Sequence, residues 1–192
     1  MELTDRFNQA LLLMFELHSK QIRKGTKIPY ISHLLAVTTT VLENGSHEDE
    51  AIAALLHDAA EDAGGKEILI RIRERFGVRV ADIVEHCSDT LEADKPPWQP
   101  RKEAYLASLA AINDPSILLV SIADKLHNAK SILKDYKTCG NKVWTRFSAT
   151  ERQIIWYYQS LLSIYQSKSN LCPGHLVEEL QQTIKELASH IK

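Results

Sequence analysis

Residues 54–62 read Ala54-Leu55-Leu56-His57-Asp58-Ala59-Ala60-Glu61-Asp62. The chain upstream of this segment is apolar at helical spacing, whereas the segment itself turns to ionisable groups and alanines. Residues four apart share one face of an α-helix, so Glu61 is expected above His57 and Asp62 above Asp58. Burying this much negative charge is costly unless a cation neutralises it. The segment therefore indicates a metal site carried by a helix.

Two further candidates lie elsewhere in the chain. His33 follows Pro29-Tyr30-Ile31-Ser32 at the start of a predicted helix, where the chain turns inward. Asp124 interrupts the apolar run 117–123, and a carboxylate in that setting needs a partner. Taken together in the order His…His-Asp…Asp, the four residues form a mixed imidazole and carboxylate set that suits a divalent cation.

Each of these residues also has an ordinary structural explanation. A single histidine such as His33 is commonly a buried, hydrogen-bonded side chain, and Glu61 and Asp62 could be solvated acids at a helix end. Asp124 could pair with Lys125 or Lys130. The combination, and not any one residue, carries the metal hypothesis.

The rest of the sequence predicts an all-α fold. Glycine (7) and proline (6) are scarce, which favours long regular elements, and no alternating strand pattern of useful length is present. We find no internal repeat and no linker, so residues 1–192 are expected to form a single compact helical domain. The predicted helices span about residues 3–20, 31–42, 46–64, 66–76, 78–87, 98–112, 117–133, 149–165 and 176–191.

Composition excludes several classes of protein. A hydrophobic fraction of 44% and a charged fraction of 25% are ordinary for a globular domain. A net charge of -2 provides no global positive field for nucleic acid, so a phosphate-bearing ligand needs a local cluster of cations. There is no signal-peptide pattern and no apolar run near the roughly 20 residues that span a bilayer. We expect a cytoplasmic protein with no membrane partner; its oligomeric state is left open.

Over about residues 3–165 the chain resembles the HD-domain metal-dependent phosphohydrolase superfamily. It is most similar to the hydrolase domains of the RelA/SpoT family and their small single-domain relatives, which degrade guanosine 3′,5′-bis(diphosphate). The matching segments are His18-x-x-Gln21-x-Arg23-Lys24-Gly25, Pro29-Tyr30-Ile31-x-His33, Ala54-Leu55-Leu56-His57-Asp58-x-x-Glu61-Asp62 and Ile122-Ala123-Asp124-Lys125-Leu126-His127-Asn128.

The resemblance implies a role for nine residues and an all-helical fold. His33, His57, Asp58 and Asp124 match metal ligands, and Glu61 and Asp62 match the acids that position or activate the attacking water. Arg23 and Lys24 match a basic pair lining the nucleotide pocket, and Asn128 matches a nucleotide contact. The usual metal of the family is manganese, whereas ligand chemistry alone leaves Fe²⁺, Mg²⁺ and Zn²⁺ open.

Three functions are compared on this basis. The first is removal of the 3′-pyrophosphate from guanosine 3′,5′-bis(diphosphate), favoured by Arg23-Lys24 and Asn128. The second is a phosphohydrolase for another nucleotide or a nucleoside monophosphate, because the loop 89–97 lacks close similarity to the family. The third is a non-catalytic, metal-stabilised sensor module. The presence of both Glu61 and Asp62 argues against this third function. A structural helical protein without metal would leave Asp58 and Asp124 without counter-charges.

Two basic segments have alternative interpretations. Lys95, Trp98, Arg101 and Lys102 can border a phosphate site or form a solvated helix start. Without the family resemblance, Arg23 and Lys24 would be interpreted as solvated residues before a glycine turn. No synthetase segment accompanies the helical unit, so hydrolysis and not synthesis is expected.

Overall fold

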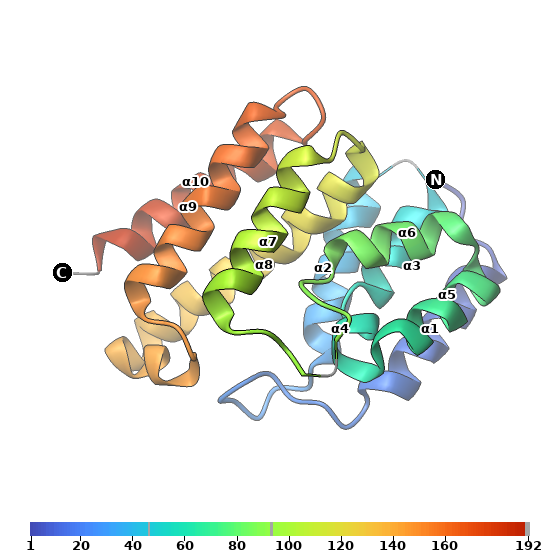
Figure 1. Cartoon of the computed structure of the whole chain (residues 1–192), viewed down its shortest axis with the longest axis horizontal. Coiled ribbons are helices and arrows are strands. Elements are labelled where there is room, and N and C mark those ends of the chain that lie inside the picture. The colour runs from blue at the N-terminus through green and yellow to red at the C-terminus, as the bar shows by residue number, and fades with distance from the viewer. Residues whose placement is uncertain (46, 93, 191–192) are drawn as a thin grey trace. The chain divides into compact units, whose positions relative to one another are not determined.

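The computed structural model describes residues 1–45, 47–92 and 94–190 (Figure 1). Within these ranges the regular elements are α-helices and one 3-10 helix, and extended backbone is paired at an isolated bridge between Ile22 and Pro29. The prediction of an all-α fold is confirmed. In chain order the elements are α1 (Asp5–His18), α2 (Ile31–Asn44), α3 (Glu48–Leu56), α4 (Ala59–Ala63), α5 (Gly65–Phe76), α6 (Val78–Cys87), α7 (Trp98–Ala111), α8 (Pro115–Cys139), the 3-10 helix η1 (Gly140–Arg146), α9 (Glu151–Ser167) and α10 (Gly174–Ser189).

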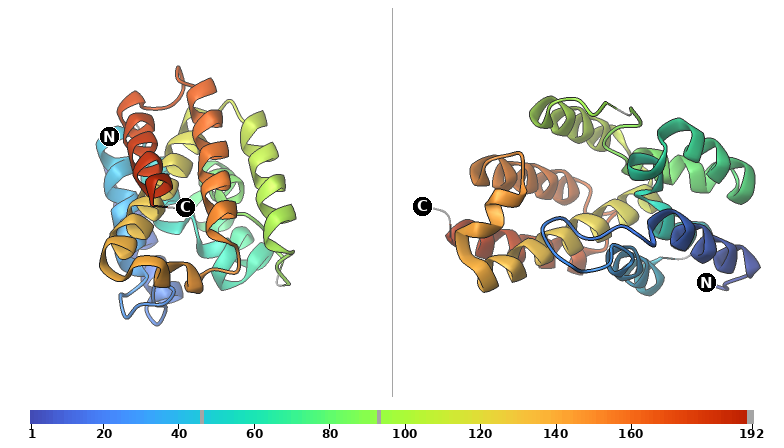
Figure 2. Two further views of the ribbon diagram at one scale, coloured as in Figure 1. Left: turned by 90° about the vertical axis from the view of Figure 1, so that its left-hand side faces the viewer. Right: turned by 90° about the horizontal axis from the view of Figure 1, so that it is seen from below.

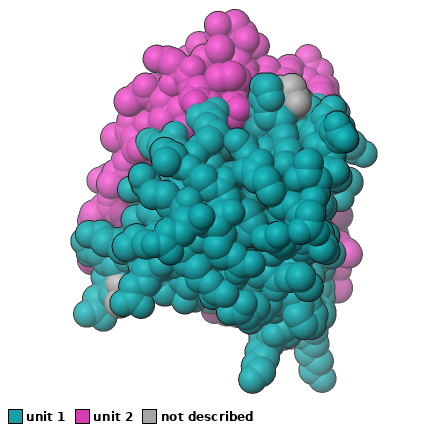
Figure 3. Space-filling model, turned by 90° about the vertical axis from the view of Figure 1, so that its right-hand side faces the viewer, with its two compact units in different colours: residues 1–96 teal, residues 97–192 magenta. Residues whose placement is uncertain are grey.

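The chain divides into two compact units, Met1–Pro96 and Pro97–Lys192, which Figure 3 distinguishes by colour. The first unit contains α1 to α6, and the second contains α7 to α10 with η1. The predicted site residues are distributed over both units. Asp124 and Asn128 belong to the second, and the other seven belong to the first.

The first unit is built around α3. All residues from Glu50 to Leu56 are buried, and α3 packs against α1, α2 and α6. A helix that is apolar on every side is stable only when other elements surround it, which these three helices do. His57 and Asp58 follow directly, so the central helix delivers them into the interior of the unit.

The second unit is built around α8. Its residues from Ser116 to Leu126 are all buried, and it packs against α9, α10 and η1. Figure 2 shows α9 and α10 lying beside each other, and these two helices also pack together. Asp114 begins α8 as its N-cap, accepting hydrogen bonds from the backbone of Ser116 and Ile117, and Pro115 occupies the first helical position.

Ser121 on α8 connects two buried tyrosines. Its hydroxyl lies 2.9 Å from that of Tyr105 on α7 and 2.7 Å from that of Tyr165 on α9. Burial raises the pKa of the Tyr165 phenol well above its ordinary value, so the phenol keeps its proton for this network. The three hydroxyls fix the register of α7 and α9 against the helix that carries Asp124.

Several predicted helix bounds need correction. The single helix predicted over 46–64 is wrong, because α3 ends at Leu56 and α4 begins at Ala59, although His57 and Asp58 between them keep backbone angles in the right-handed helical region. The helix predicted over 117–133 continues to Cys139 and is followed by η1, which the sequence did not predict. The predicted start at residue 46 and end at residue 191 lie outside the described residues.

No helix in the described part of the chain combines the length and the apolar character that crossing a bilayer would require.

The hydroxyl network predicts a specific stability effect. Tyr165→Phe should lower the free energy of unfolding by about 1 kcal/mol, because it removes a buried hydrogen bond while leaving the ring in place. Tyr136→Phe is the matched control, since the hydroxyl of the half-buried Tyr136 donates to the carbonyl of His190 over 3.4 Å. Urea unfolding of both variants measures the difference, and equal stabilities would show that the network contributes nothing.

Candidate metal centre

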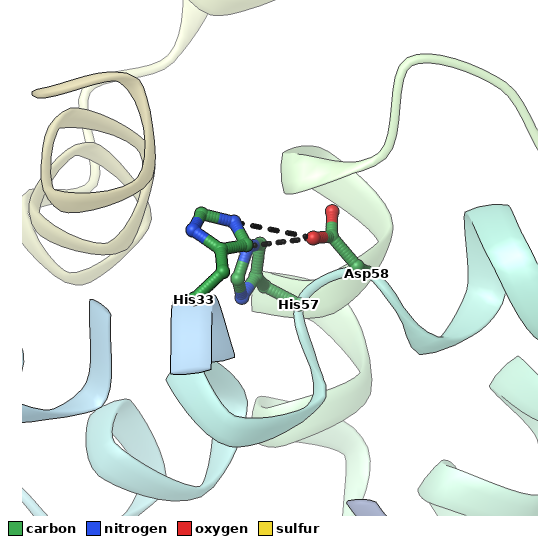
Figure 4. Close-up of side chains that lie close together, drawn as sticks. All are labelled: His33, His57 and Asp58. Carbon is green, nitrogen blue, oxygen red and sulfur yellow. Dashed lines mark ion pairs between the residues drawn. The ribbon is translucent and has the colours of Figure 1, made fainter. Parts of the chain in front are cut away.

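His33, His57 and Asp58 converge in the first unit (Figure 4). Each offers one ligand atom, and these atoms all lie within 4.8 Å of one another. Nε2 of His33 lies 3.4 Å from Oδ2 of Asp58, and Nε2 of His57 lies 3.1 Å from the same oxygen. Both imidazoles are buried, and 17% of the Asp58 side chain is exposed. The structure thus brings together three of the four predicted metal ligands.

The orientation of His57 is set by the helix that precedes it. Its Nδ1 lies 2.8 Å from the carbonyl oxygen of Ala54, and a carbonyl oxygen only accepts hydrogen bonds. Nδ1 therefore carries the proton in the neutral ring, and Nε2 presents a lone pair toward Asp58. A histidine that donates one ring nitrogen to a backbone carbonyl and offers the other to a cation is a common arrangement of metal ligands.

This donor set fits a divalent cation. In the neutral tautomer, the lone pair of His57 faces a carboxylate oxygen, and two electron-rich atoms at this distance repel one another unless a positive charge lies near both. Imidazole and carboxylate together suit first-row divalent metals. His57 and Asp58 lie between the end of α3 and the start of α4, so the three side chains converge at the junction of these two helices.

Tyr30 contacts the same carboxylate oxygen of Asp58 as the two histidines. Its hydroxyl donates to Oδ2 of Asp58 at 2.6 Å. The ring stacks against His18 at 5.7 Å between centroids, and the guanidinium of Arg23 lies 5.6 Å from the ring centre. Arg23, one of the predicted nucleotide contacts, is thus connected to the candidate metal centre through one side chain.

Sequence reasoning included Tyr30 in a motif but gave it no role. The available signal was its position three residues before His33 at the start of the same helix. The predicted nucleotide contact Lys24 is exposed on the loop between α1 and α2, and its role stays a prediction.

Glu61 and Asp62 lie on α4 and share a cation. Nζ of Lys95 donates to Oε1 of Glu61 at 2.9 Å and to Oδ1 of Asp62 at 3.2 Å. Glu61 also accepts from the backbone N–H of Asp89 at 3.0 Å. Burial alone would lower the pKa of Lys95, but the hydrogen bonds and charges of the two acids outweigh it and raise that pKa. Lys95 therefore remains charged at neutral pH.

The expectation that Glu61 and Asp62 stack over His57 and Asp58 on one continuous helix is wrong in its premise, since α3 and α4 are separate. One helical hydrogen bond of the expected pattern is present, since the N–H of Asp62 donates to the carbonyl of Asp58 at 3.0 Å. The sequence left two interpretations open for the basic segment that contains Lys95, a border of the phosphate site or a solvated helix start. The contact of Lys95 with both acids depends on the path of a loop, which the sequence pattern does not specify.

Asp124 and Asn128 lie one turn apart on α8, as predicted. Nδ2 of Asn128 donates to Oδ1 of Asp124 at 2.5 Å, and Nζ of Lys125 donates to Oδ2 at 2.7 Å. The ammonium of Lys125 also lies 4.8 Å from the ring centre of Tyr105. The pairing with Lys125, which was the ordinary alternative for Asp124, is therefore present. A role for Asp124 as a metal ligand and for Asn128 as a nucleotide contact stays a prediction.

Comparison with known proteins identifies the family. The family model described as HD domain matches residues 10–156. The chain belongs to the HD-domain family. Together with the convergence of His33, His57 and Asp58, this membership shows an HD-domain protein with a group able to hold a divalent metal ion.

Curated relatives match part of this HD-domain chain. It is 38% identical over 117 residues to a guanosine-3′,5′-bis(diphosphate) 3′-pyrophosphohydrolase of Aquifex aeolicus, a match that covers 61% of the chain and 16% of that protein. It is 31% identical over 132 residues to the bifunctional (p)ppGpp synthase/hydrolase SpoT of Escherichia coli, covering 66% and 18%. The match thus spans less than a fifth of the length of each relative.

Solved structures confirm the HD-domain fold. A metazoan ortholog of SpoT, described as hydrolysing ppGpp, matches with a TM-score of 0.76 at 21% identity, covering 97% of both chains. A crystal structure from Listeria monocytogenes matches with a TM-score of 0.65 at 26% identity, covering 80% of this chain and 96% of the other. At this level of identity the first similarity establishes the fold alone.

The support that Tyr30 gives to Asp58 can be tested by metal binding. Tyr30→Phe should weaken Mn²⁺ binding by roughly 10- to 100-fold, because loss of a hydrogen bond to a ligating carboxylate typically has this effect. Isothermal titration calorimetry on chelator-treated protein measures the dissociation constant. Tyr136→Phe, in the second unit, serves as the control and should bind Mn²⁺ like the wild type. Equal affinity in both variants would remove Tyr30 from the site.

Proposed function

We propose that the protein is a divalent-metal-dependent phosphohydrolase that removes the 3′-pyrophosphate from guanosine 3′,5′-bis(diphosphate). The observation that carries the proposal is the convergence of His33, His57 and Asp58, with His57 held by the Ala54 carbonyl so that Nε2 faces Asp58. The names of the relatives support the substrate, since several of them are 3′-pyrophosphohydrolases of this nucleotide.

The proposed metal ligands are His33, His57, Asp58 and Asp124. Support for Asp124 comes from the order of the residues in the family motif and from its burial in an otherwise apolar stretch of α8. Two imidazoles and two carboxylates are compatible with Mn²⁺ or Fe²⁺, and Mn²⁺ is the metal we propose. A bound divalent cation stabilises charge on phosphoryl oxygens and lowers the pKa of water from 15.7 toward about 7.

Glu61 and Asp62 are the proposed acids that orient the attacking water and accept its proton. Glu61 accepts hydrogen bonds from Lys95 and Asp89, and Asp62 accepts from Lys95 and Gln21. An ionised carboxylate offers about four lone-pair positions, so one carboxylate can accept from protein donors and from a water together. General-base assistance of this kind typically contributes a factor of roughly 10² to 10⁴ in rate.

Arg23, Lys24 and Asn128 are the proposed nucleotide contacts. The guanidinium of Arg23 lies over the ring of Tyr30, and the hydroxyl of Tyr30 donates to Asp58. A phosphate or base bound by Arg23 would therefore be held in a defined position relative to the proposed metal ligands. A planar guanidinium can grip phosphate through two donors or stack on a base, whereas Lys24 supplies a point charge.

We also propose that residues 1–192 act as one HD-type domain. The family match runs from residue 10 to residue 156 and therefore includes sequence from both compact units. This supports the assignment of both sequence segments to one HD-type domain.

The deciding experiment measures hydrolysis by protein stripped with chelator and reloaded with Mn²⁺, Fe²⁺, Mg²⁺ or Zn²⁺. The substrates are guanosine 3′,5′-bis(diphosphate), GTP, GDP and a panel of nucleoside monophosphates, with release of pyrophosphate or phosphate as the readout. We expect pyrophosphate release from the first compound with Mn²⁺. Turnover of a different nucleotide would assign another substrate, and metal binding without any turnover would indicate a sensor module.

Variants separate the roles of the residues. Asp58→Asn and Asp124→Asn should each lose at least tenfold in Mn²⁺ affinity together with activity, because a ligand carboxylate becomes a neutral amide. Glu61→Gln should bind Mn²⁺ normally while its kcat falls by roughly 10² or more. Asp5→Asn and Glu74→Gln, both at exposed positions of the first unit, are the matched controls. Wild-type metal affinity in Asp124→Asn would remove that residue from the ligand set.

A further inference from the structure

A hydrogen-bonded chain leads from His18, at the end of α1, to Asp62. Nδ1 of His18 lies 2.5 Å from Oε1 of Gln21, and Nε2 of Gln21 donates to Oδ2 of Asp62 at 2.9 Å. Neither His18 nor Gln21 contributes a donor to the proposed metal or takes part in the proposed water activation. Their arrangement nevertheless ends on one of the two acids.

The direction of each hydrogen bond follows from the chemistry of its end. An ionised carboxylate can only accept, so the amide nitrogen of Gln21 must face Asp62 and its carbonyl oxygen must face His18. That oxygen also only accepts, so Nδ1 of His18 must carry the proton. The tautomer of His18 thus determines which end of the Gln21 amide faces the acid.

The surroundings of His18 favour the same tautomer. The side chain is buried, and its Nε2 has no hydrogen-bond partner among the described residues. A bare lone pair at such a position costs less than an unsatisfied N–H, which would lose its hydrogen bond to water. The ring also stacks on Tyr30, which limits its rotation.

The backbone holds Gln21 in place as well. Its N–H donates to the carbonyl of His18 at 3.0 Å, and its carbonyl accepts from the N–H of Tyr30 at 2.9 Å. The side chain therefore projects toward α4 from a fixed base. With Lys95 on the other oxygen of Asp62, the carboxylate is held by donors from two separate segments.

We propose that His18 and Gln21 are positioning residues that fix the orientation of the Asp62 carboxylate for the reaction. This inference rests on the proposed function, because it assigns Asp62 a role in catalysis. His18 and Gln21 act through Asp62 and do not touch the substrate. Their removal should lower kcat while leaving KM and metal affinity unchanged.

The kinetic test uses Gln21→Met, which keeps the length of the side chain and removes both hydrogen bonds. We expect kcat to fall about 10- to 100-fold, since small misplacement of a reacting group can cost up to 10² in rate, with KM and the Mn²⁺ dissociation constant within about twofold of wild type. Gln9→Met is the matched control, because Nε2 of Gln9 also donates to an aspartate, Asp5, at 2.8 Å on the same unit. An unchanged kcat in Gln21→Met would overturn the proposal.

A double-mutant cycle distinguishes positioning from a general loss of structure. If Gln21 acts through Asp62, then Gln21→Met should have little further effect on kcat in the Asp62→Asn background. Additive effects of the two substitutions on kcat would contradict the proposal that Gln21 acts through Asp62. His18→Phe should resemble Gln21→Met because it keeps the ring on Tyr30 and removes the donor, and His18→Asn should recover part of the activity because its amide nitrogen replaces Nδ1.

A spectroscopic test does not depend on the substrate. Nitrogen NMR of ¹⁵N-histidine-labelled, metal-free protein reports the tautomer of His18, and we expect the proton on Nδ1 in the wild type and a shift of the population toward Nε2–H in Gln21→Met. If the wild-type His18 ring is protonated on Nε2 alone, the proposed positioning of Asp62 by His18 and Gln21 is overturned, even if the enzyme is active. Failure of the proposed function would appear instead as absence of hydrolysis with the Nδ1 tautomer intact.

Discussion

The short contact between Nε2 of His57 and Oδ2 of Asp58 is the constraint around which the first unit is organised. The Ala54 carbonyl fixes the ring so that a lone pair faces the carboxylate, and Tyr30 adds a donor to the same oxygen. A cation bound at this point would neutralise the carboxylate, which is only partly exposed to water, and would accept the lone pair of the imidazole. The buried helix α3 therefore both fills the core of the first unit and places His57 and Asp58 at its C-terminal end.

The second unit contains a buried carboxylate, on α8, which accepts hydrogen bonds from residues of the same helix. Asp124 is buried in a helix whose neighbouring residues are apolar, and it is held by Lys125 and Asn128. Lys125 in turn lies over the ring of Tyr105, whose hydroxyl joins Ser121 and Tyr165. The acid is thus restrained by its own helix and by a hydroxyl network that sets the register of α7 and α9. In each unit a largely buried helical stretch, residues 50–56 of α3 or residues 116–126 of α8, carries or directly precedes proposed metal ligands.

Periodicity predicted the helical fold, because it depends on local spacing. The convergence of His33 with His57 and Asp58 was predicted from the order of the residues, the cost of burying ionisable groups and the family resemblance. The interruption of the helix at residues 57–58 was not predicted, since both segments favour helix and the break is decided by tertiary packing. The contacts of Lys95 with Glu61 and Asp62 depend on a loop with no periodic pattern. The role of Tyr30 was missed because a tyrosine before a helix has many uses, and its hydroxyl partner lies 28 residues away.

The restraint on the acid pair bears on how the reaction is divided between protein and metal. Glu61 accepts from Lys95 and from the backbone of Asp89, and Asp62 accepts from Lys95 and Gln21. Donors that occupy these oxygens fix the direction of the remaining lone pairs, which suits a water that must be held in line. One of these donors, Lys95, is a cation beside the two proposed proton acceptors, and its raised pKa keeps it charged at neutral pH. In the proposed reaction these protein groups would orient the water and accept its proton, and a cation bound by His33, His57 and Asp58 would lower the pKa of that water.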